Sequence, residues 1–205
     1  MKGTIARTVI FLLLVISTAA LASCKTATRA PSGQDDFKLT VYYEGVFVDD
    51  DQAVIELAKQ MRGENTPFEK ESIDFHVTVF FEPQEPFLEK LGTPVDIVFT
   101  GYARKAVDTE EYGTVYAEAF KVDLVTDDQE LQAYIDKSII NWHITCSYSH
   151  IPRYSGHIDF SDALPVNVTL SGVYGAYLGD GVYAFNQEEL AQAEEVLKNA
   201  AEPVK

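Results

Sequence analysis

Two tetrapeptides of the same form, His-hydrophobic-Thr-hydrophobic, carry the residue types in this chain that are best suited to chemistry. They occupy residues 76–79 (HVTV) and 143–146 (HITC) and lie 67 residues apart. The chain has only four His, and chance would place a Thr two residues after two of four His in roughly 3% of chains of this composition. An imidazole titrates near neutrality, and a neighbouring hydroxyl can donate a hydrogen bond. The repeat therefore suggests a two-histidine active site.

Both tetrapeptides lie in segments that favour strands. Residues 72–81 and 139–148 are rich in β-branched and aromatic residues, which favour pleated, half-buried backbone over helix. Residues i and i+2 of a strand point to the same face. We therefore expect the His and Thr of each tetrapeptide to project together, with the apolar residues packed behind them. The candidate catalytic residues are His76, Thr78, His143 and Thr145.

The end of the second strand and the polar loop after it, residues 149–165, supply further candidates. We consider Tyr148, Arg153 and Tyr154 as candidate substrate contacts. The alternative interpretation is that the loop side chains simply face solvent, which is the more common outcome for a polar loop.

A metal site is another interpretation of the histidines. His143, His150 and His157 are each seven residues apart, which is not the short spacing of dedicated zinc ligands. Either His-x-Thr pair could also be purely structural, since a single His on a strand is more often a satisfied structural residue than a catalytic one. The pairing of two such motifs favours function, and we expect no metal ligand.

The N-terminal segment predicts export. Lys2 and Arg7 precede an apolar run over residues 9–16, a pattern typical of a secretory signal and too short for a comfortable membrane span. Residues 21–24 (LASC) resemble the lipobox of bacterial lipoproteins, which implies cleavage before Cys24 and lipidation of its thiol. The alternative is an ordinary signal peptide with an incidental Cys. Because residue 25 is Lys rather than Asp, we expect anchoring in the outer membrane, facing the periplasm.

The remaining chain is predicted to form one domain behind a tether. Residues 1–23 would be the signal peptide, 24–36 a lipidated flexible tether, and 37–205 the domain. If Cys24 carries lipid, Cys146 is alone and no intramolecular disulfide can form. The domain must then be stable through its core, and we expect a monomer.

The charge of the chain narrows its partners. The formal net charge is −16, and without Lys2 and Arg7 there are 14 basic and 32 acidic residues, a net charge of −18. Such a protein repels a long nucleic acid and an anionic membrane at long range. Attachment to the membrane would therefore depend on the lipid of Cys24, whereas a small phosphorylated ligand needs only a local group of donors. A solvated, soluble surface would also explain the acidity.

The other elements alternate in an α+β pattern. A helix over residues 52–62 follows carboxylates at 49–51 and ends at Gly63, a second is opened by a capping box of Thr126 and Gln129, and a third is capped by Asn186. Strands are predicted over 37–48, 72–81, 95–102, 114–123, 139–148, 166–178 and 181–185.

The paired His-x-Thr motifs on strands resemble the two-histidine (2H) phosphoesterase superfamily. Residues 43–50 (YEGVFVDD) resemble the first strand of its RNA-repair branch, found in tRNA ligases. The resemblance covers most of the chain after the tether. It implies a bilobal α+β fold of two antiparallel sheets, with helices packed outside and the His strands adjacent across a central cleft. It also implies no metal or cofactor, and action on 2′,3′-cyclic phosphates of small nucleotides or RNA ends.

Hydrolysis of such a phosphodiester needs a base for the attacking water, an acid for the leaving oxygen and donors for the non-bridging oxygens. We expect His143 as the base, His76 as the acid, and Thr78 and Thr145 as the donors. The reverse assignment of the histidines remains open, because chemistry in the opposite direction exchanges their roles. The alternative function is a lipid-anchored binding protein that holds a nucleotide or another anion in the same cleft without turning it over.

Overall fold

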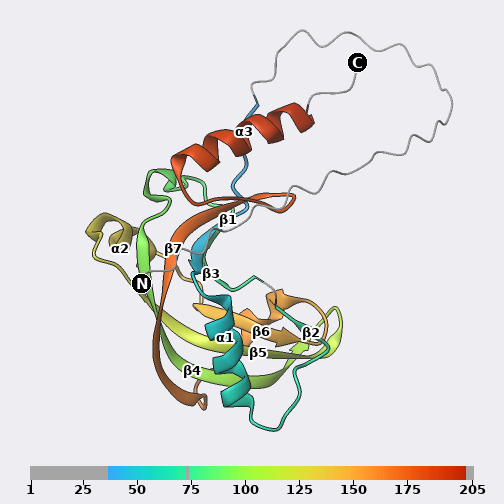
Figure 1. Ribbon diagram of the computed structural model, residues 1–205. Helices are drawn as coiled ribbons and strands as arrows, with labels where there is room; N and C mark the ends of the chain where they lie inside the picture. The colour runs from blue at the N-terminus through green and yellow to red at the C-terminus, as the bar shows by residue number, and fades with distance from the viewer. Residues whose placement is uncertain (1–36, 73, 202–205) are drawn as a thin grey trace, which may run out of the picture. The chain divides into compact units, whose positions relative to one another are not determined.

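The computed structural model describes residues 37–72 and 74–201, so the predicted signal peptide, Cys24 and the tether lie outside the described residues. The strands of the described part form one antiparallel sheet in the order β2-β6-β5-β4-β7-β1-β3, with β8 paired to β7. They are β1 (Tyr43–Val48), β2 (Lys70–Glu71), β3 (His76–Phe81), β4 (Pro94–Thr109), β5 (Gly113–Val125), β6 (His143–Tyr148), β7 (Leu164–Gly179) and β8 (Val182–Ala184). The α+β class is confirmed, and the long strands β4 and β7 curve side by side through the sheet (Figure 1).

The helices follow the predicted positions with one correction. They are α1 (Asp51–Arg62), α2 (Gln129–Ile135), α3 (Gln187–Ala201) and the 3₁₀ turns η1 (Leu88–Lys90) and η2 (Pro152–His157). The cap of α2 is Asp128, whose carboxylate accepts from the amide of Leu131 at 3.0 Å. The predicted capping box at Thr126 is wrong, because the Thr126 hydroxyl donates instead to the carbonyl of Pro94 at 2.8 Å. No helix of the described part is long and apolar enough to cross a membrane.

The sheet curls until β3, at one edge, approaches β6. At the other edge β2 continues the sheet beyond β6 for two residues, and the amide of Ser72 just after β2 donates to the carbonyl of Cys146 on β6 at 2.9 Å. The hydroxyl of Ser138, ahead of β6, donates to the carbonyl of Val79 on β3 at 2.6 Å. We call the line along which β3 and β6 meet the seam.

The expectation of two separate sheets is not confirmed in the described part of the chain. Strands β4 and β7 are 16 residues long and pair with each other, so the two halves share one hydrogen-bonded ladder. Both ladders of β4 shift between Phe99 and Gly101, and such irregularities bend a strand and increase its twist. The curl comes from bent long strands rather than from a second sheet.

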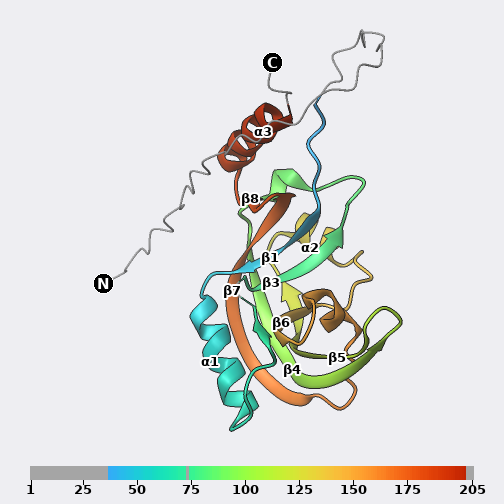
Figure 2. The same cartoon turned by 90° about the vertical axis from the view of Figure 1, so that its right-hand side faces the viewer.

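The interior of the curl holds the main core. Val77, Val79, Ile144 and Cys146, the apolar residues of both tetrapeptides, are at most 4% exposed and belong to this core, as predicted. Helix α1 adds Val54 to it and packs along β7, while α3 lies beyond the end formed by β7 and β8 (Figure 2). Because side chains alternate along a strand, the His and Thr of each tetrapeptide lie on the outer face.

Candidate two-histidine site

The first tetrapeptide has a defined register against β1. Thr78 lies opposite Gly45, and His76 lies opposite Phe47. The register then shifts. The next residue of β1, Glu44, lies opposite Phe80, so Val79 is left without a partner on β1. An extra residue on one strand is a β-bulge. The bulge therefore falls on the fourth residue of the His-x-Thr motif.

The second tetrapeptide repeats this register against β5. Thr145 lies opposite Ala119, and His143 lies opposite Lys121. The shift again follows immediately, with Cys146 as the extra residue before Ser147. Two short sequence motifs with the same pairing pattern and the same bulge form an internal repeat at the level of the strands.

The two imidazoles lie on strands that approach each other across the seam, where Ser138 donates to Val79. Burial lowers the pKa of His76, the nearby carboxylate of Asp74 opposes that shift, and the proximity of His143 lowers the pKa further. Two protonated imidazoles repel each other, and this contribution is in keeping with the approach of β3 to β6. The curl of the sheet thus brings together residues that are 67 positions apart.

His76 stands in an aromatic and acidic environment. Its ring stacks on Tyr43 and Phe47, with centroid distances of 4.9 and 5.4 Å. Its Nδ1 lies 4.0 Å from the Asp74 carboxylate, which is an ion-pair distance rather than a hydrogen-bond distance. That carboxylate accepts a hydrogen bond from the Tyr183 hydroxyl at 2.7 Å. An acidic group on this side stabilises the protonated imidazole.

His143 has a different environment. Its Nδ1 lies 2.7 Å from the carbonyl oxygen of Asn141, and a carbonyl can only accept, so Nδ1 carries the hydrogen. Burial lowers the pKa of His143, and the bond to Asn141 opposes the shift. Its Nε2 lies 2.9 Å from the hydroxyl oxygen of Ser155, which is also 2.5 Å from the hydroxyl oxygen of Thr145. One hydroxyl on η2 thus meets both outward polar groups of the second motif.

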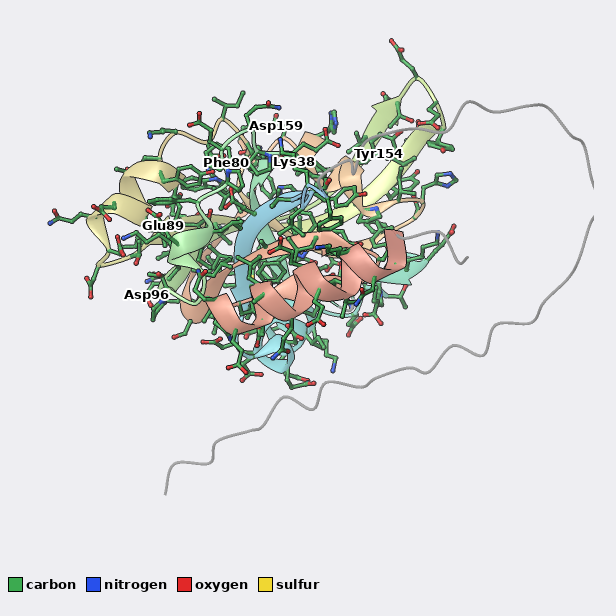
Figure 3. All side chains as sticks on the ribbon, turned by 90° about the horizontal axis from the view of Figure 1, so that it is seen from above. Lys38, Phe80, Glu89, Asp96, Tyr154 and Asp159 are labelled. Carbon is green, nitrogen blue, oxygen red and sulfur yellow. The ribbon has the colours of Figure 1, made fainter. Side chains whose placement is uncertain are left out.

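The three tentative substrate contacts lie in different surroundings. Tyr148 is half-buried on the face of Thr145, because both residues pair with residues of β5 two positions apart. Tyr154 is 8% exposed and packs in a second core that includes Ala117, beside the β4–β5 hairpin (Figure 3). Arg153 lies in η2 and its side chain is outside the described part. Tyr154 therefore anchors η2, and contact of any of the three with a substrate stays a prediction.

Three residues of the site were not singled out by the sequence patterns: Asp74, Lys121 and Ser155. Asp74 precedes His76 by two residues, a spacing that places both on one strand face and could have signalled it. Lys121 is exposed and directly opposite His143, and opposed residues have Cβ atoms about 4.5–5.5 Å apart. Ser155 gave no sequence signal, because only the path of the loop brings it to β6.

Within residues 37–72 and 74–201, no group of three or more His, Cys, Asp or Glu is placed to hold a metal ion. No family model, no curated protein and no solved structure matches this chain. A function for it must therefore be argued from the site itself. In the described part of the chain, the site offers the imidazoles of His76 and His143, the hydroxyls of Thr78 and Thr145, Lys121 opposite His143 and the Asp74 carboxylate near His76.

Proposed function

We propose that this protein is a metal-independent phosphodiesterase that acts on 2′,3′-cyclic phosphates of small nucleotides or RNA ends. The observation that carries the proposal is the equivalence of the two motifs: in each, the His-x-Thr pair has the same register and bulge and lies on the sheet face opposite the main core, and the two strands approach at the seam. Two imidazoles on opposite sides of a phosphate can act as base for the attacking water and acid for the leaving oxygen.

A bilobal arrangement of the 2H type is part of the proposal. One lobe would comprise β3, β1 and β7, and the other β6, β5 and β4. In each lobe the His strand, β3 or β6, pairs with a neighbouring strand, β1 or β5. That neighbour in turn pairs with one of the long strands, β7 or β4. The two lobes are then halves of one curled sheet related by an approximate twofold axis, and the seam is the candidate cleft.

The two environments support His143 as the base and His76 as the acid. The Asn141 carbonyl holds the hydrogen of His143 on Nδ1, which leaves Nε2 with a lone pair for a proton of water. Asp74 stabilises a protonated His76, which can give its proton to the departing ribose oxygen. Water attacks phosphorus, the bond to one ribose oxygen breaks, and a phosphomonoester remains.

The non-bridging oxygens need donors that face the same side. Thr78 and Thr145 flank the imidazoles, and Lys121 is the cation nearest to His143 along the ladder. Hydrogen bonds to a charged phosphate are about twice as strong as those between neutral groups. A single local cation is compatible with the strongly acidic composition, which still disfavours a long RNA.

The deciding experiment is hydrolysis of the four 2′,3′-cyclic nucleoside monophosphates in the presence of EDTA. We expect turnover by the wild type and a loss of roughly 10²–10⁴-fold in His76→Ala and in His143→Ala. His157→Ala is the matched control, because His157 is an exposed histidine on η2, and it should retain activity. Turnover that survives the double substitution of His76 and His143 would refute the mechanism.

A non-catalytic binding protein remains the second candidate, and the contact of Ser155 with His143 and Thr145 favours it. In this case adenosine 2′-monophosphate or another small anion would bind, and the cyclic phosphates would remain intact. Calorimetry beside the hydrolysis assay separates the two functions. Membrane attachment through lipid on Cys24 is proposed for either function, and incorporation of labelled palmitate that is lost in Cys24→Ala would test it.

A further inference from the structure

We propose that η2 is a strap over His143 and Thr145, and that the Ser155 hydroxyl holds the place of a ligand oxygen there. The inference rests on the proposed function for the identity of that ligand, a phosphate group. The half-site formed by His143 and Thr145 would then become accessible only when η2 lifts from β6.

The first reason is the convergence of the polar groups on one oxygen. Nε2 of His143 and Oγ1 of Thr145 lie 2.9 and 2.5 Å from Oγ of Ser155. These are the distances at which both groups would hold a phosphate oxygen. Ser155 is 1% exposed, so it is enclosed rather than presented to solvent. Its hydroxyl therefore replaces a ligand instead of acting beside one.

The second reason is steric. A Cβ atom added at Gly156 would lie 3.3 Å from Cε1 of His143, so the backbone of η2 rests against the imidazole. The same Cβ atom would lie 3.9 Å from Nε2, so the turn covers the side of the ring that a phosphate oxygen would have to reach. The closed turn and a bound phosphate exclude each other at this half-site.

The third reason is that two acceptors compete for the hydroxyl hydrogen of Ser155 in the closed state. Ser155 has one hydroxyl hydrogen, and both the carbonyl of Pro152, at 2.7 Å, and Nε2 of His143 lie within reach of it. Because Nδ1 carries the hydrogen of the neutral imidazole, Nε2 can only accept. The single hydroxyl hydrogen of Ser155 can go to only one of these two acceptors, so its bond to His143 competes with its bond to Pro152 and is more easily replaced by a ligand.

The strap is anchored at its centre. Tyr154 and Ile158 pack with Ala103, Ala117 and other residues of the second core, and the Tyr154 hydroxyl donates to the carboxylate of Glu111 at 3.3 Å. No side chain caps the N-terminus of the turn. Removing the Tyr154 ring should therefore release η2 from β5, whereas removing the Ser155 hydroxyl should only loosen its contact with β6.

The test measures access to His143 in the full chain. Carbethoxylation by diethyl pyrocarbonate is followed for each His by mass spectrometry. In the wild type we expect His143 to react at least ~10-fold more slowly than the exposed His157, and Tyr154→Ala to raise its rate at least ~5-fold relative to His76. Ser155→Ala is a smaller change that leaves Tyr154 in the core. It should also raise the carbethoxylation rate of His143, by less than Tyr154→Ala does.

Ser161→Ala is the matched control, because Ser161 lies in the same connection and, among the described residues, its side chain bonds to Asp159 rather than to β6. It should leave the rate of His143 unchanged. A His143 rate that is as high as that of His157 in the wild type, or that neither η2 variant alters while both remain folded by circular dichroism, overturns the strap.

Hydrolysis of 2′,3′-cyclic AMP by the same variants separates this inference from the proposed function. Faster carbethoxylation together with faster hydrolysis in Ser155→Ala supports both. Faster carbethoxylation without hydrolysis by any form supports the strap and contradicts the phosphodiesterase. Unchanged carbethoxylation with hydrolysis by the wild type overturns the strap and leaves the phosphodiesterase in place.

Discussion

Glu44 on β1 and Glu118 on β5 are equivalent buried carboxylates in the two halves of the sheet. Each is 0% exposed and immediately precedes the residue that lies opposite the Thr of a His-x-Thr motif. Each accepts a hydrogen bond from a tyrosine hydroxyl, from Tyr134 at 2.7 Å and from Tyr102 at 2.5 Å respectively. The internal repeat therefore extends from the outer face of the sheet into its interior.

The two carboxylates differ in their charged partners. Replacing each Glu by Gln should therefore lower the free energy of unfolding by different amounts. Arg62 makes two hydrogen bonds to Glu118, at 2.9 and 3.0 Å. Glu118→Gln leaves the buried guanidinium with only the more distant and exposed carboxylate of Glu71, at 3.8 Å, and should lower the free energy of unfolding by about 3 kcal/mol.

Glu44 accepts from the Tyr134 hydroxyl and from the amide of Phe87 at 2.7 Å, and no salt bridge involves it in the described part of the chain. Burial raises its pKa, and these hydrogen bonds oppose the shift. Glu44→Gln keeps an acceptor and removes a buried charge, so it should change stability by no more than about 1 kcal/mol. Urea unfolding of both variants at pH 7 checks the contrast, and equal costs would contradict it.

Stability should decrease on acidification through the two histidines. Burial lowers the pKa of His76 and of His143 in the folded protein, whereas a histidine in the unfolded chain titrates near ~6.5. Between the pKa of the folded state and that of the unfolded state, the unfolded protein binds more protons. The contribution of the two neutral histidines to stability is therefore fully present above about pH 6.5 and is lost as the pH falls toward their folded pKa.

The measurement is urea unfolding between about pH 7.5 and pH 5.5. The double variant His76→Gln, His143→Gln should show a flatter profile than the wild type over this interval. His157→Gln is the control, because that side chain is exposed and should leave the profile unchanged. An equally steep profile in the double variant would assign the pH dependence to other groups.

Lys121 should contribute to phosphate binding without being required for folding. It is exposed and lies opposite His143, where the equivalent position beside His76 is Phe47. Lys121→Met should weaken binding of adenosine 2′-monophosphate by roughly 10-fold, the loss of one charged hydrogen bond. Lys198→Met on α3 makes the same change of net charge away from the site, and calorimetry should find its affinity close to that of the wild type.

Gly45 and Ala119 occupy equivalent positions opposite Thr78 and Thr145, yet only one of them tolerates a side chain. A Cβ atom at Gly45 would lie 2.5 Å from the carbonyl oxygen of Val77. Gly45→Ala should therefore destabilise the protein by about 1–3 kcal/mol through overpacking and displace the strand that carries His76. Ala119→Gly should cost less, about 0.5–1 kcal/mol, and a reversed order in thermal unfolding would contradict the packing argument.

Local features were predictable because they depend on neighbours in sequence. The first helix has its carboxylate cap at Asp50 and ends at Gly63, where φ is 63°. The final helix has its cap at Asn186, which accepts from the amide of Glu189 at 2.9 Å. The capping box predicted at Thr126 was wrong because the Thr126 hydroxyl donates to the carbonyl of Pro94, which is distant in sequence. A local motif cannot predict such a partner.

The sequence by itself determined the strands that carry His76 and His143 and the alternation that turns both imidazoles away from the core. Periodicity and side-chain type are enough for this, because neither depends on the rest of the fold. Only the tertiary structure decided that one sheet curls until β3 and β6 meet, that Lys121 stands opposite His143, and that Ser155 covers the second motif. Strand pairing and loop path join residues far apart in the chain, so no local pattern records them.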